Sequence, residues 1–246
     1  MRHKPGSPSE YTRLLGSLDD FEGDVTRFSQ DGGQGLNITV PFQRAAWRLA
    51  DELSKRAHTA GGQYPDRLEA ASGGDNTIGI GLVRDLTINH GFRFKGKRVL
   101  ILGAGGAVRG VVHPLLEEQP KRLIIANRTA AKAYSLATVL SGFGPVAGCG
   151  LDELEGMQFD LIINGTAAGL GGEVPKIPEG VLTKGSWCYD MMYGDEPTAF
   201  QKWARERHAA RALDGLGMLV EQAAESFRLW RDILPDTVPV IQMLRG

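Results

Sequence analysis

Short apolar runs alternate with stretches of helical periodicity between residues 98 and 190. The runs are rich in Ile, Leu and Val, which predicts strands buried on both faces. The predicted strands are residues 99–102, 122–126, 159–163 and 187–190, and the predicted helices are residues 107–116 and 130–140. Strand and helix in alternation predict a parallel sheet covered by helices.

On either side of this region the pattern changes. A short strand is predicted over residues 36–40, and Pro41 suits the first position of the helix after it. The next apolar positions share helical spacing and predict one helix: Phe42, Ala46, Leu49, Leu53 and Ala57. A loop is predicted over residues 58–76, and helices are predicted over residues 78–89 and 217–234. We expect two lobes with a cleft between them.

Composition and charge narrow the class of protein. The 246 residues are 42% hydrophobic and 23% charged, which is typical of a soluble α/β protein. A net charge of −1 gives no electrostatic reason to expect nucleic acid or an anionic membrane as a partner. No apolar stretch is long enough to span a membrane, and we expect no signal peptide. We therefore expect a cytoplasmic protein that acts on a small molecule.

The two cysteines do not indicate a metal site. Cys149 and Cys188 are far apart in sequence and lack the spacing of metal ligands. We expect two reduced thiols and no bound metal.

The predicted strand at residues 99–102 runs into a turn that is almost without side chains, Gly103-Ala-Gly-Gly-Ala107. A helix that begins at such a turn presents unpaired N–H groups and a partial positive charge, which favour phosphate. Gly103 and Gly105 match the first two glycines of the dinucleotide fingerprint, whereas Val108 stands at the third. The turn indicates either a dinucleotide site or a tight structural turn.

The next predicted strand ends in Asn127-Arg-Thr129, with Lys132 one helical turn further on. In NAD-binding folds an acidic residue near this position accepts hydrogen bonds from the ribose. Here Arg128, Thr129 and Lys132 instead offer groups that suit the 2′-phosphate of NADP. The alternative is structural: Asn127 caps the next helix and both cations are solvated.

Seven short stretches together resemble the shikimate dehydrogenase family over residues 14–246. They are GLNITVPF, GDNT, GAGGAVRG, ANRT, INGT, CYDMMY and DGLGMLVEQAA. The resemblance implies NADPH-dependent reduction of 3-dehydroshikimate to shikimate, a step of the shikimate pathway in aromatic amino acid biosynthesis. It implies an α/β fold of two lobes, with a Rossmann-type, doubly wound parallel sheet in residues 93–214. The smaller α/β substrate lobe is expected to comprise residues 1–92, joined by the C-terminal helix in residues 215–246.

The resemblance also implies a set of cofactor-binding residues. Those for the pyrophosphate are Gly103, Ala104, Gly105, Gly106 and Ala107. Those for the adenosine phosphate are Asn127, Arg128, Thr129 and Lys132. Those for the nicotinamide and its ribose are Asn164, Thr166, Met191 and Gly215. For the last two, core packing of Met191 and a helix-boundary turn at Gly215 are the structural alternatives.

The substrate half of the family pattern is altered. Gln43 stands where the family has a catalytic lysine, and Ile78 stands where it has a catalytic aspartate. The opening strand and carboxylate site are mostly missing, and residues 62–65 replace a segment with a substrate-binding asparagine. The remnant of the carboxylate site is Ser7-Pro8, with Ser9 just beyond it, and the retained substrate positions are Thr39, Tyr193 and Gln222.

The lost pair affects proton transfer, because alcohol oxidation releases a proton together with the hydride. Glutamine does not titrate and isoleucine forms no hydrogen bond, so neither replaces a lysine–carboxylate pair. Asp75, His58 and Tyr64 are candidates to take over. Three functions stay open: a shikimate dehydrogenase with an altered substrate site, an NADP-binding pseudoenzyme, and an oxidoreductase for another small alcohol or carbonyl. We expect a monomer or a homodimer.

The strand end at Arg128 generates a first prediction. Arg128→Ala should weaken NADP binding by about 1.5–3 kcal/mol, the range for hydrogen bonds to charged groups. Wild-type protein should bind NADP(H) well and NAD(H) poorly, since no acid is present for the ribose hydroxyls. Calorimetric titration checks both statements, and equal affinities for NADP and NAD would overturn the assignment.

Overall fold

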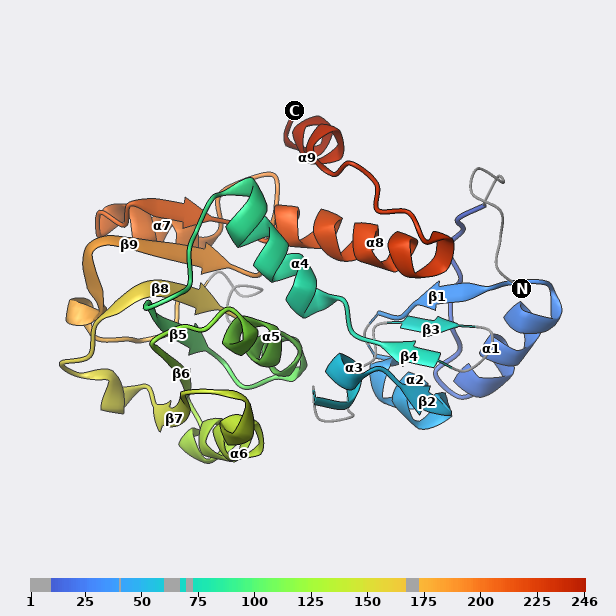
Figure 1. The fold of residues 1–246 in the computed structure, drawn as a ribbon, viewed down its shortest axis with the longest axis horizontal. Helices are drawn as coiled ribbons and strands as arrows, with labels where there is room; N and C mark the ends of the chain where they lie inside the picture. The colour runs from blue at the N-terminus through green and yellow to red at the C-terminus, as the bar shows by residue number, and fades with distance from the viewer. Residues whose placement is uncertain (1–9, 40, 60–66, 70–72, 167–172) are drawn as a thin grey trace.

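The computed structural model describes residues 10–39, 41–59, 67–69, 73–166 and 173–246, which form two β-sheets. In Figure 1 the larger sheet lies at the left and the smaller one at the right. Helices α4 (Ile78–Arg84) and α8 (Leu216–Arg231) run between the two. The predicted α/β fold class is confirmed.

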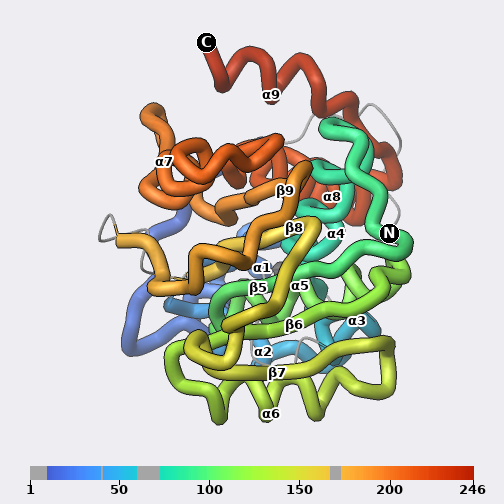
Figure 2. The backbone as a smooth tube through the Cα atoms, turned by 90° about the vertical axis from the view of Figure 1, so that its left-hand side faces the viewer, coloured from blue at the N-terminus to red at the C-terminus, as the bar shows by residue number. Residues whose placement is uncertain are grey.

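The larger sheet has six strands within the described residues, all parallel, in the order β10-β9-β8-β5-β6-β7. Figure 2 shows β9, β8, β5, β6 and β7 following one another in this order. The strands are β5 (Arg98–Leu102), β6 (Arg122–Asn127), β7 (Val146–Gly150), β8 (Phe159–Asn164), β9 (Leu182–Asp190) and β10 (Arg211–Leu213). The helices between them are α5 (Gly106–Glu117), α6 (Ala130–Leu140) and α7 (Ala199–Glu206). All four predicted strands and both predicted helices of this region are present.

Strand β5 lies in the middle of this sheet and is buried on both faces. Val99 and Ile101 pack into a core that includes Val111 of α5. Leu100 and Leu102 point to the opposite face, where Phe200 of α7 packs. Successive side chains of a strand alternate between faces, so a strand covered by helices on both sides is apolar at every position.

The smaller sheet has four strands within the described residues, in the order β1-β3-β4-β2. They are β1 (Gly35–Asn37), β2 (Glu52–Leu53), β3 (Arg67–Glu69) and β4 (Gly73–Asp75). Strands β1 and β4 run antiparallel to β3, and β2 runs parallel to β4. The helices near this sheet are α1 (Phe21–Gln30), α2 (Gln43–Leu49) and α3 (Lys55–Thr59).

The single helix predicted through Phe42 and Ala57 is wrong. Helix α2 ends at Ala50, whose backbone is extended, and Glu52 and Leu53 form β2 beside β4. Ser54 then starts α3, because its hydroxyl accepts a hydrogen bond from the Ala57 amide at 3.1 Å. The apolar spacing continues across the break, with Ala46 of α2 and Ala57 of α3 both buried.

The loop predicted over residues 58–76 is also partly wrong, because β3 and β4 lie in it. These strands contain Gly, Asp and Arg rather than β-branched residues, so no local signal marks them. The pattern also missed β7, β10, α1, α7 and α9 (Val238–Arg245). For α7 a signal existed: Thr198 and Gln201 form a capping box.

Helix α8 is joined to the smaller sheet by a buried carboxylate. The Glu225 side chain is fully buried and forms ion pairs with Arg56 of α3 at 3.0 Å, Arg84 of α4 at 2.9 Å and Arg228 at 2.8 Å. Further along α8, the Ser226 and Thr77 hydroxyls lie 3.5 Å apart. Helix α8 is therefore tied both to α3, beside the smaller sheet, and to α4.

This cluster predicts acid sensitivity of the fold. Burial raises the pKa of Glu225, but Arg228, Arg56 and Arg84 outweigh it and lower the pKa from 4.5 to about 2. The folded state therefore binds this proton less readily, and the stabilisation is present above pH 4.5 and lost as the pH falls to about 2. One pKa unit corresponds to 1.36 kcal/mol, so about 3 kcal/mol is at stake.

Glu225→Gln should lower the free energy of unfolding at pH 7 by about 3–5 kcal/mol, because arginine charges lose their partner. Its unfolding should also vary less with pH between 4.5 and 2 than that of the wild type. Urea unfolding at several pH values measures both, with Glu206→Gln on exposed α7 surface as the control. Parallel pH profiles for Glu225→Gln and wild type would contradict the explanation.

Candidate cofactor and substrate site

The carboxyl ends of the parallel strands all meet at one edge of the larger sheet. The chain proceeds outward from β5 through β6 to β7 on one side and through β8 to β9 and β10 on the other. The two directions separate between β5 and β8. In open parallel sheets this switch point is where ligands bind, in the crevice outside the strand ends.

Gly103 makes the turn at the end of β5. Its φ of 106° is a conformation that L side chains rarely adopt, and a Cβ there would lie 3.0 Å from the Gly165 carbonyl oxygen. Gly105, by contrast, has an extended backbone and open space around it. As the N-cap of α5, Gly105 offers no side-chain acceptor, so the first amides of α5 stay available to an anion.

Val108 replaces the third glycine of the fingerprint, and the structure accommodates it. The Val108 side chain is fully buried and lies above Gly165, the residue after β8. A Cβ at Gly165 would lie 2.5 Å from the Val108 side chain. The close helix–strand approach that the fingerprint glycine normally allows is therefore supplied here by the glycine on the facing strand end.

The end of β6 carries the two candidate cations. Arg128 and Lys132 are exposed, and neither forms an ion pair with another described residue. Asn127 donates through Nδ2 to the Thr129 carbonyl at 2.9 Å, and Thr129, not Asn127, is the N-cap of α6. The structural alternative of an Asn127 cap is therefore wrong, and both cations remain open to a phosphate.

The ends of β8 and β9 bring Thr166 and Met191 to the same edge. Asn164 is fully buried, and its Oδ1 accepts hydrogen bonds from the Thr166 amide at 3.2 Å and hydroxyl at 2.7 Å. The Met191 amide donates to the Asn164 carbonyl at 2.9 Å. Gly215 lies against Met191, because a Cβ there would lie 2.3 Å from the Met191 carbonyl oxygen.

The candidate substrate residues come from three separate places. Thr39 and Gln43 lie where the chain enters α2, and the Phe42 amide donates to the Thr39 carbonyl at 3.0 Å. Gln222 on α8 packs against Gly81 of α4. Tyr193 follows β9 and is 48% exposed. Among the described residues, no hydrogen bond links Thr39 or Gln43 with Tyr193 or Gln222.

Ile78 is the first residue of α4 and packs against the larger core. Its side chain packs against apolar neighbours, and the family resemblance predicted a catalytic aspartate at this position. Position 78 therefore contributes packing rather than a proton-carrying group.

Asp75 is engaged elsewhere and is a poor replacement base. Its carboxylate accepts from Arg56 at 2.6 and 2.8 Å and from the Ser54 hydroxyl at 2.7 Å. Burial raises the pKa of Asp75, but the Arg56 hydrogen bonds and charge lower it further, so the net shift is downward. A carboxylate with a lowered pKa and bound donors does not take up a proton near neutral pH.

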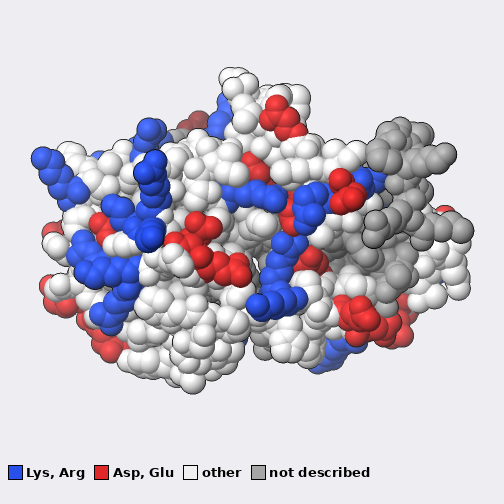
Figure 3. Space-filling view, viewed as in Figure 1, with Lys and Arg blue, Asp and Glu red and all other residues white. Residues whose placement is uncertain are grey.

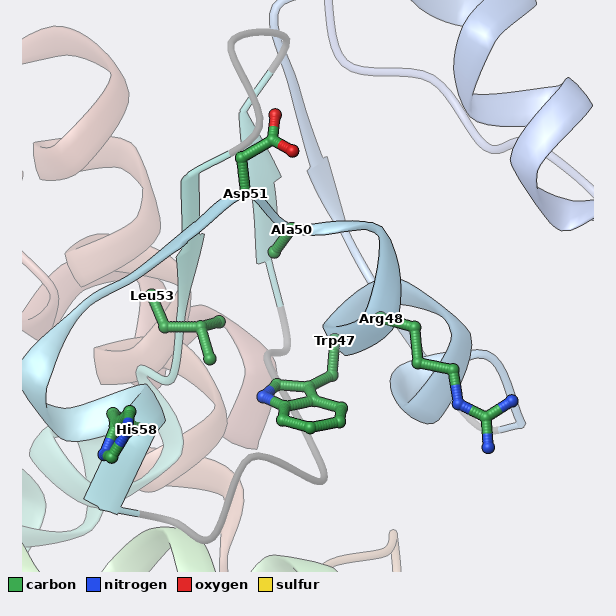
Figure 4. A pocket seen from close by; sticks show the side chains of 6 residues that line it. All are labelled: Trp47, Arg48, Ala50, Asp51, Leu53 and His58. Atoms are coloured by element: carbon green, nitrogen blue, oxygen red, sulfur yellow. The ribbon is translucent and has the colours of Figure 1, made fainter.

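His58 lies in a pocket beside the smaller sheet (Figure 4). The pocket has a volume of about 490 Å³, and Trp47 of α2 and Leu53 of β2 are among its lining residues. Tyr64, the third candidate proton carrier, lies outside the described residues, as do Ser7, Pro8, Ser9 and residues 62–65.

No group of His, Cys, Asp or Glu among the described residues is arranged to hold a metal ion. Both cysteines are buried and unpaired. Burial raises the pKa of Cys149 to about 11 and that of Cys188 to about 12, so both thiols stay protonated. No described helix is long and apolar enough to cross a membrane.

Charges of both signs are interspersed over the face in Figure 3, and the surface is indented between the two sheet-bearing parts of the chain. Two residues of the site escaped the sequence analysis: Gly165 and Asp190. Both belong to quoted motifs, INGT and CYDMMY, and both stand at predicted strand ends. Their position in the sheet would have marked them, because carboxyl ends of neighbouring parallel strands meet.

A parallel sheet whose switch point carries a glycine turn and a helix N-terminus defines a nucleotide-binding protein of the Rossmann class. Three family models match the chain: the shikimate dehydrogenase substrate binding domain over residues 2–62, shikimate / quinate 5-dehydrogenase over residues 86–170, and the shikimate 5′-dehydrogenase C-terminal domain over residues 215–245. A relative from Alkalilimnicola ehrlichii named shikimate dehydrogenase (NADP(+)) is 52% identical, over 98% of this chain and 89% of its own. The chain belongs to the shikimate dehydrogenase family, as its motifs predicted.

Solved structures agree with this assignment. An Ael1 enzyme from Pseudomonas putida is 42% identical with a TM-score of 0.86, over 95% of this chain and 86% of that one. A shikimate 5-dehydrogenase from Thermus thermophilus in complex with NADP(H) and shikimate is 27% identical with a TM-score of 0.79. That match covers 93% of this chain and 84% of that one. The predicted Rossmann-type fold is confirmed.

The same substitution should have different effects at the two glycines of the turn. Gly103→Ala should cost roughly 1–3 kcal/mol of stability, because its backbone conformation is strained for any side chain. Gly105→Ala should change stability by less than about 1 kcal/mol but weaken NADP binding about tenfold or more, because its methyl group would occupy the phosphate approach. Thermal unfolding and NADP titration of both variants test this. If Gly105→Ala bound NADP with normal affinity, the assignment of the phosphate to this turn would be wrong.

Proposed function

We propose that this chain is an NADP-dependent oxidoreductase of the shikimate dehydrogenase type, with the nicotinamide at the carboxyl ends of β8 and β9. The observation that carries the proposal is the end of β6, where Arg128 and Lys132 are exposed without ion-pair partners among the described residues. Curated relatives about half identical to this chain are named for NADP(+), and NADP is the cofactor we assign here.

The cofactor set follows the geometry of the strand ends. The turn from Gly103 to Ala107 holds the pyrophosphate against the first amides of α5. Arg128, Thr129 and Lys132 hold the 2′-phosphate, with Asn127 bracing the turn. Asn164, Thr166, Met191 and Gly215 form the surface for the nicotinamide and its ribose. When bound, NADP supplies hydride exchange, and these residues bind and orient it.

The division into lobes is part of the same proposal. Residues 1–92 with residues 215–246 form the substrate lobe, and residues 93–214 form the cofactor lobe. The ion pairs of Glu225 with Arg56 and Arg84 support this, because they join α8 to elements from the first part of the chain.

The substrate we assign is a small hydroxy acid of the shikimate type, contacted by Thr39, Tyr193 and Gln222. Gln43 and Ile78 provide no pair that can move a proton, which limits turnover. The packing of Ile78 against the core favours altered or lost turnover over a simple exchange of catalytic groups. A protein that binds NADP without turnover is therefore the second candidate function.

The deciding experiment combines two measurements. NADPH binding is titrated directly, and NADP reduction is followed with shikimate, quinate and related hydroxy acids. Tight NADPH binding with measurable oxidation of one hydroxy acid supports the oxidoreductase. Tight binding with no reaction supports the second candidate, and absence of NADPH binding overturns both.

Restoring the family's pair tests the role of proton transfer. Gln43→Lys with Ile78→Asp should raise shikimate oxidation, by at most the roughly 10²–10⁴-fold that proton transfer contributes. Each single change should do little, because the lysine lacks its carboxylate partner and the lone aspartate is an unpaired charge against an apolar core. The pair should therefore be strongly non-additive.

The rates are measured at saturating NADP and high shikimate, with NADPH binding of every variant as the control. A double variant that binds NADPH but stays at background rate would show that proton transfer is not the missing element. The substrate pocket as a whole would then be the deficient part.

A further inference from the structure

A buried chain of hydrogen bonds runs from α7 to the turn after β8. Its members are Thr198, Asp190, Asn164 and Thr166. The cofactor set above contains the last two only. The roles assigned above leave Asp190, which is fully buried, and Thr198 unexplained.

The centre of the chain is the pair formed by Asn164 and Asp190. These residues stand opposite each other in the parallel ladder of β8 and β9, and both are fully buried. Asn164 Nδ2 donates to Asp190 Oδ1 at 3.1 Å, and the Thr198 hydroxyl donates to Asp190 Oδ2 at 2.6 Å. The Met192 amide also donates to Asp190 Oδ1, at 3.2 Å. Three donors are thus directed at one carboxylate.

This arrangement fixes which way the Asn164 amide faces. A carboxylate accepts but does not donate, so it holds the NH₂ group of Asn164 on its own side. The amide oxygen is then directed at Thr166, whose amide and hydroxyl both donate to it. With the amide reversed, an NH₂ group would face the Thr166 amide and an oxygen would face a carboxylate, and both contacts would be repulsive.

The Asp190 carboxylate also helps to hold Met191 in place, because it binds the amide of the next residue, Met192. The amide of Met192 is held by Asp190, and the amide of Met191 is held by the Asn164 carbonyl. Thr198 is itself held in place, because its hydroxyl also accepts from the Gln201 amide at the start of α7. The carboxylate is therefore anchored on a rigid helix end and directs two strand ends.

We infer that Asp190 is a positioning residue for the nicotinamide half of the cofactor, acting through Asn164 on Thr166 and through Met192 on Met191. The inference rests on the proposed NADP function. It adds that Asp190 and Thr198 act on the nicotinamide end alone, because the adenosine end lies at β6, on the opposite side of β5 from β8.

The test separates the two halves of the cofactor. The ligands are NADPH and adenosine 2′,5′-bisphosphate, which carries the adenosine phosphates but no nicotinamide. Asp190→Asn should weaken NADPH binding about 10- to 100-fold, the scale of hydrogen bonds to a charged group. Binding of adenosine 2′,5′-bisphosphate should stay within about twofold.

Asp160→Asn is the matched control. Asp160 lies on β8, the strand that carries Asn164, and accepts from the Arg98 amide at 2.8 Å and side chain at 3.2 Å, but near the amino end of the strand. Its substitution should lower thermal stability and leave the affinity for both ligands unchanged. Two variants of Thr198 serve if Asp190→Asn does not fold. Thr198→Val should also weaken NADPH binding, and Thr198→Ser, which keeps the hydroxyl, should bind NADPH as the wild type does.

The outcomes are distinguishable. If wild-type protein fails to bind adenosine 2′,5′-bisphosphate, the proposed NADP function itself is wrong. If wild-type protein binds both ligands and Asp190→Asn weakens neither, or weakens both equally, the positioning role is overturned and NADP binding stands. If the ratio of the affinities for NADPH and adenosine 2′,5′-bisphosphate is unchanged in Thr198→Val, the positioning role is likewise overturned.

Discussion

The buried carboxylate of Glu225 is the interaction on which the arrangement of the chain depends. It pairs with arginines of α3, α4 and α8 at once, and a fully buried charge is tolerated only when it is paired in this way. Arg56 in turn holds Asp75 at the end of β4, immediately before α4. The same cluster therefore sets the position of the smaller sheet, the start of α4 and the return of α8.

The larger sheet imposes the second constraint, because its parallel strands end at one edge. Three glycines allow the chain segments to approach closely there. Gly103 lies close to the Gly165 carbonyl, Gly165 makes room for Val108, and Gly215 lies against Met191. The result is a surface of backbone and small side chains bordered by two exposed cations. We propose that this surface binds an extended ligand with phosphates at one end and with the buried, hydrogen-bonded pair of Asn164 and Asp190 beneath the other.

The two halves of the candidate site differ in how their residues are held. The cofactor positions are fixed by strand ends, ladder register and hydrogen bonds. The proposed substrate positions come from the segment before α2, from α8 and from the segment after β9. Ile78, which packs against the core, stands where the family resemblance implies a catalytic aspartate. We therefore propose that the residues assigned to the nucleotide form a complete set, whereas those assigned to proton transfer are altered.

The sequence by itself determined the elements whose signal is local. The apolar strands around β5, the glycine turn and α6 follow from residue type and spacing, and the seven motifs led to the family. Only the tertiary structure decided the rest. Strands β3 and β4 exist because they pair with each other and with β1 and β2, and the helix predicted through Leu53 breaks because that residue pairs with β4. Val108 is accepted because Gly165 faces it, and Asp190 meets Asn164 through strand register. Such contacts join residues far apart in the chain, so spacing along the sequence does not encode them.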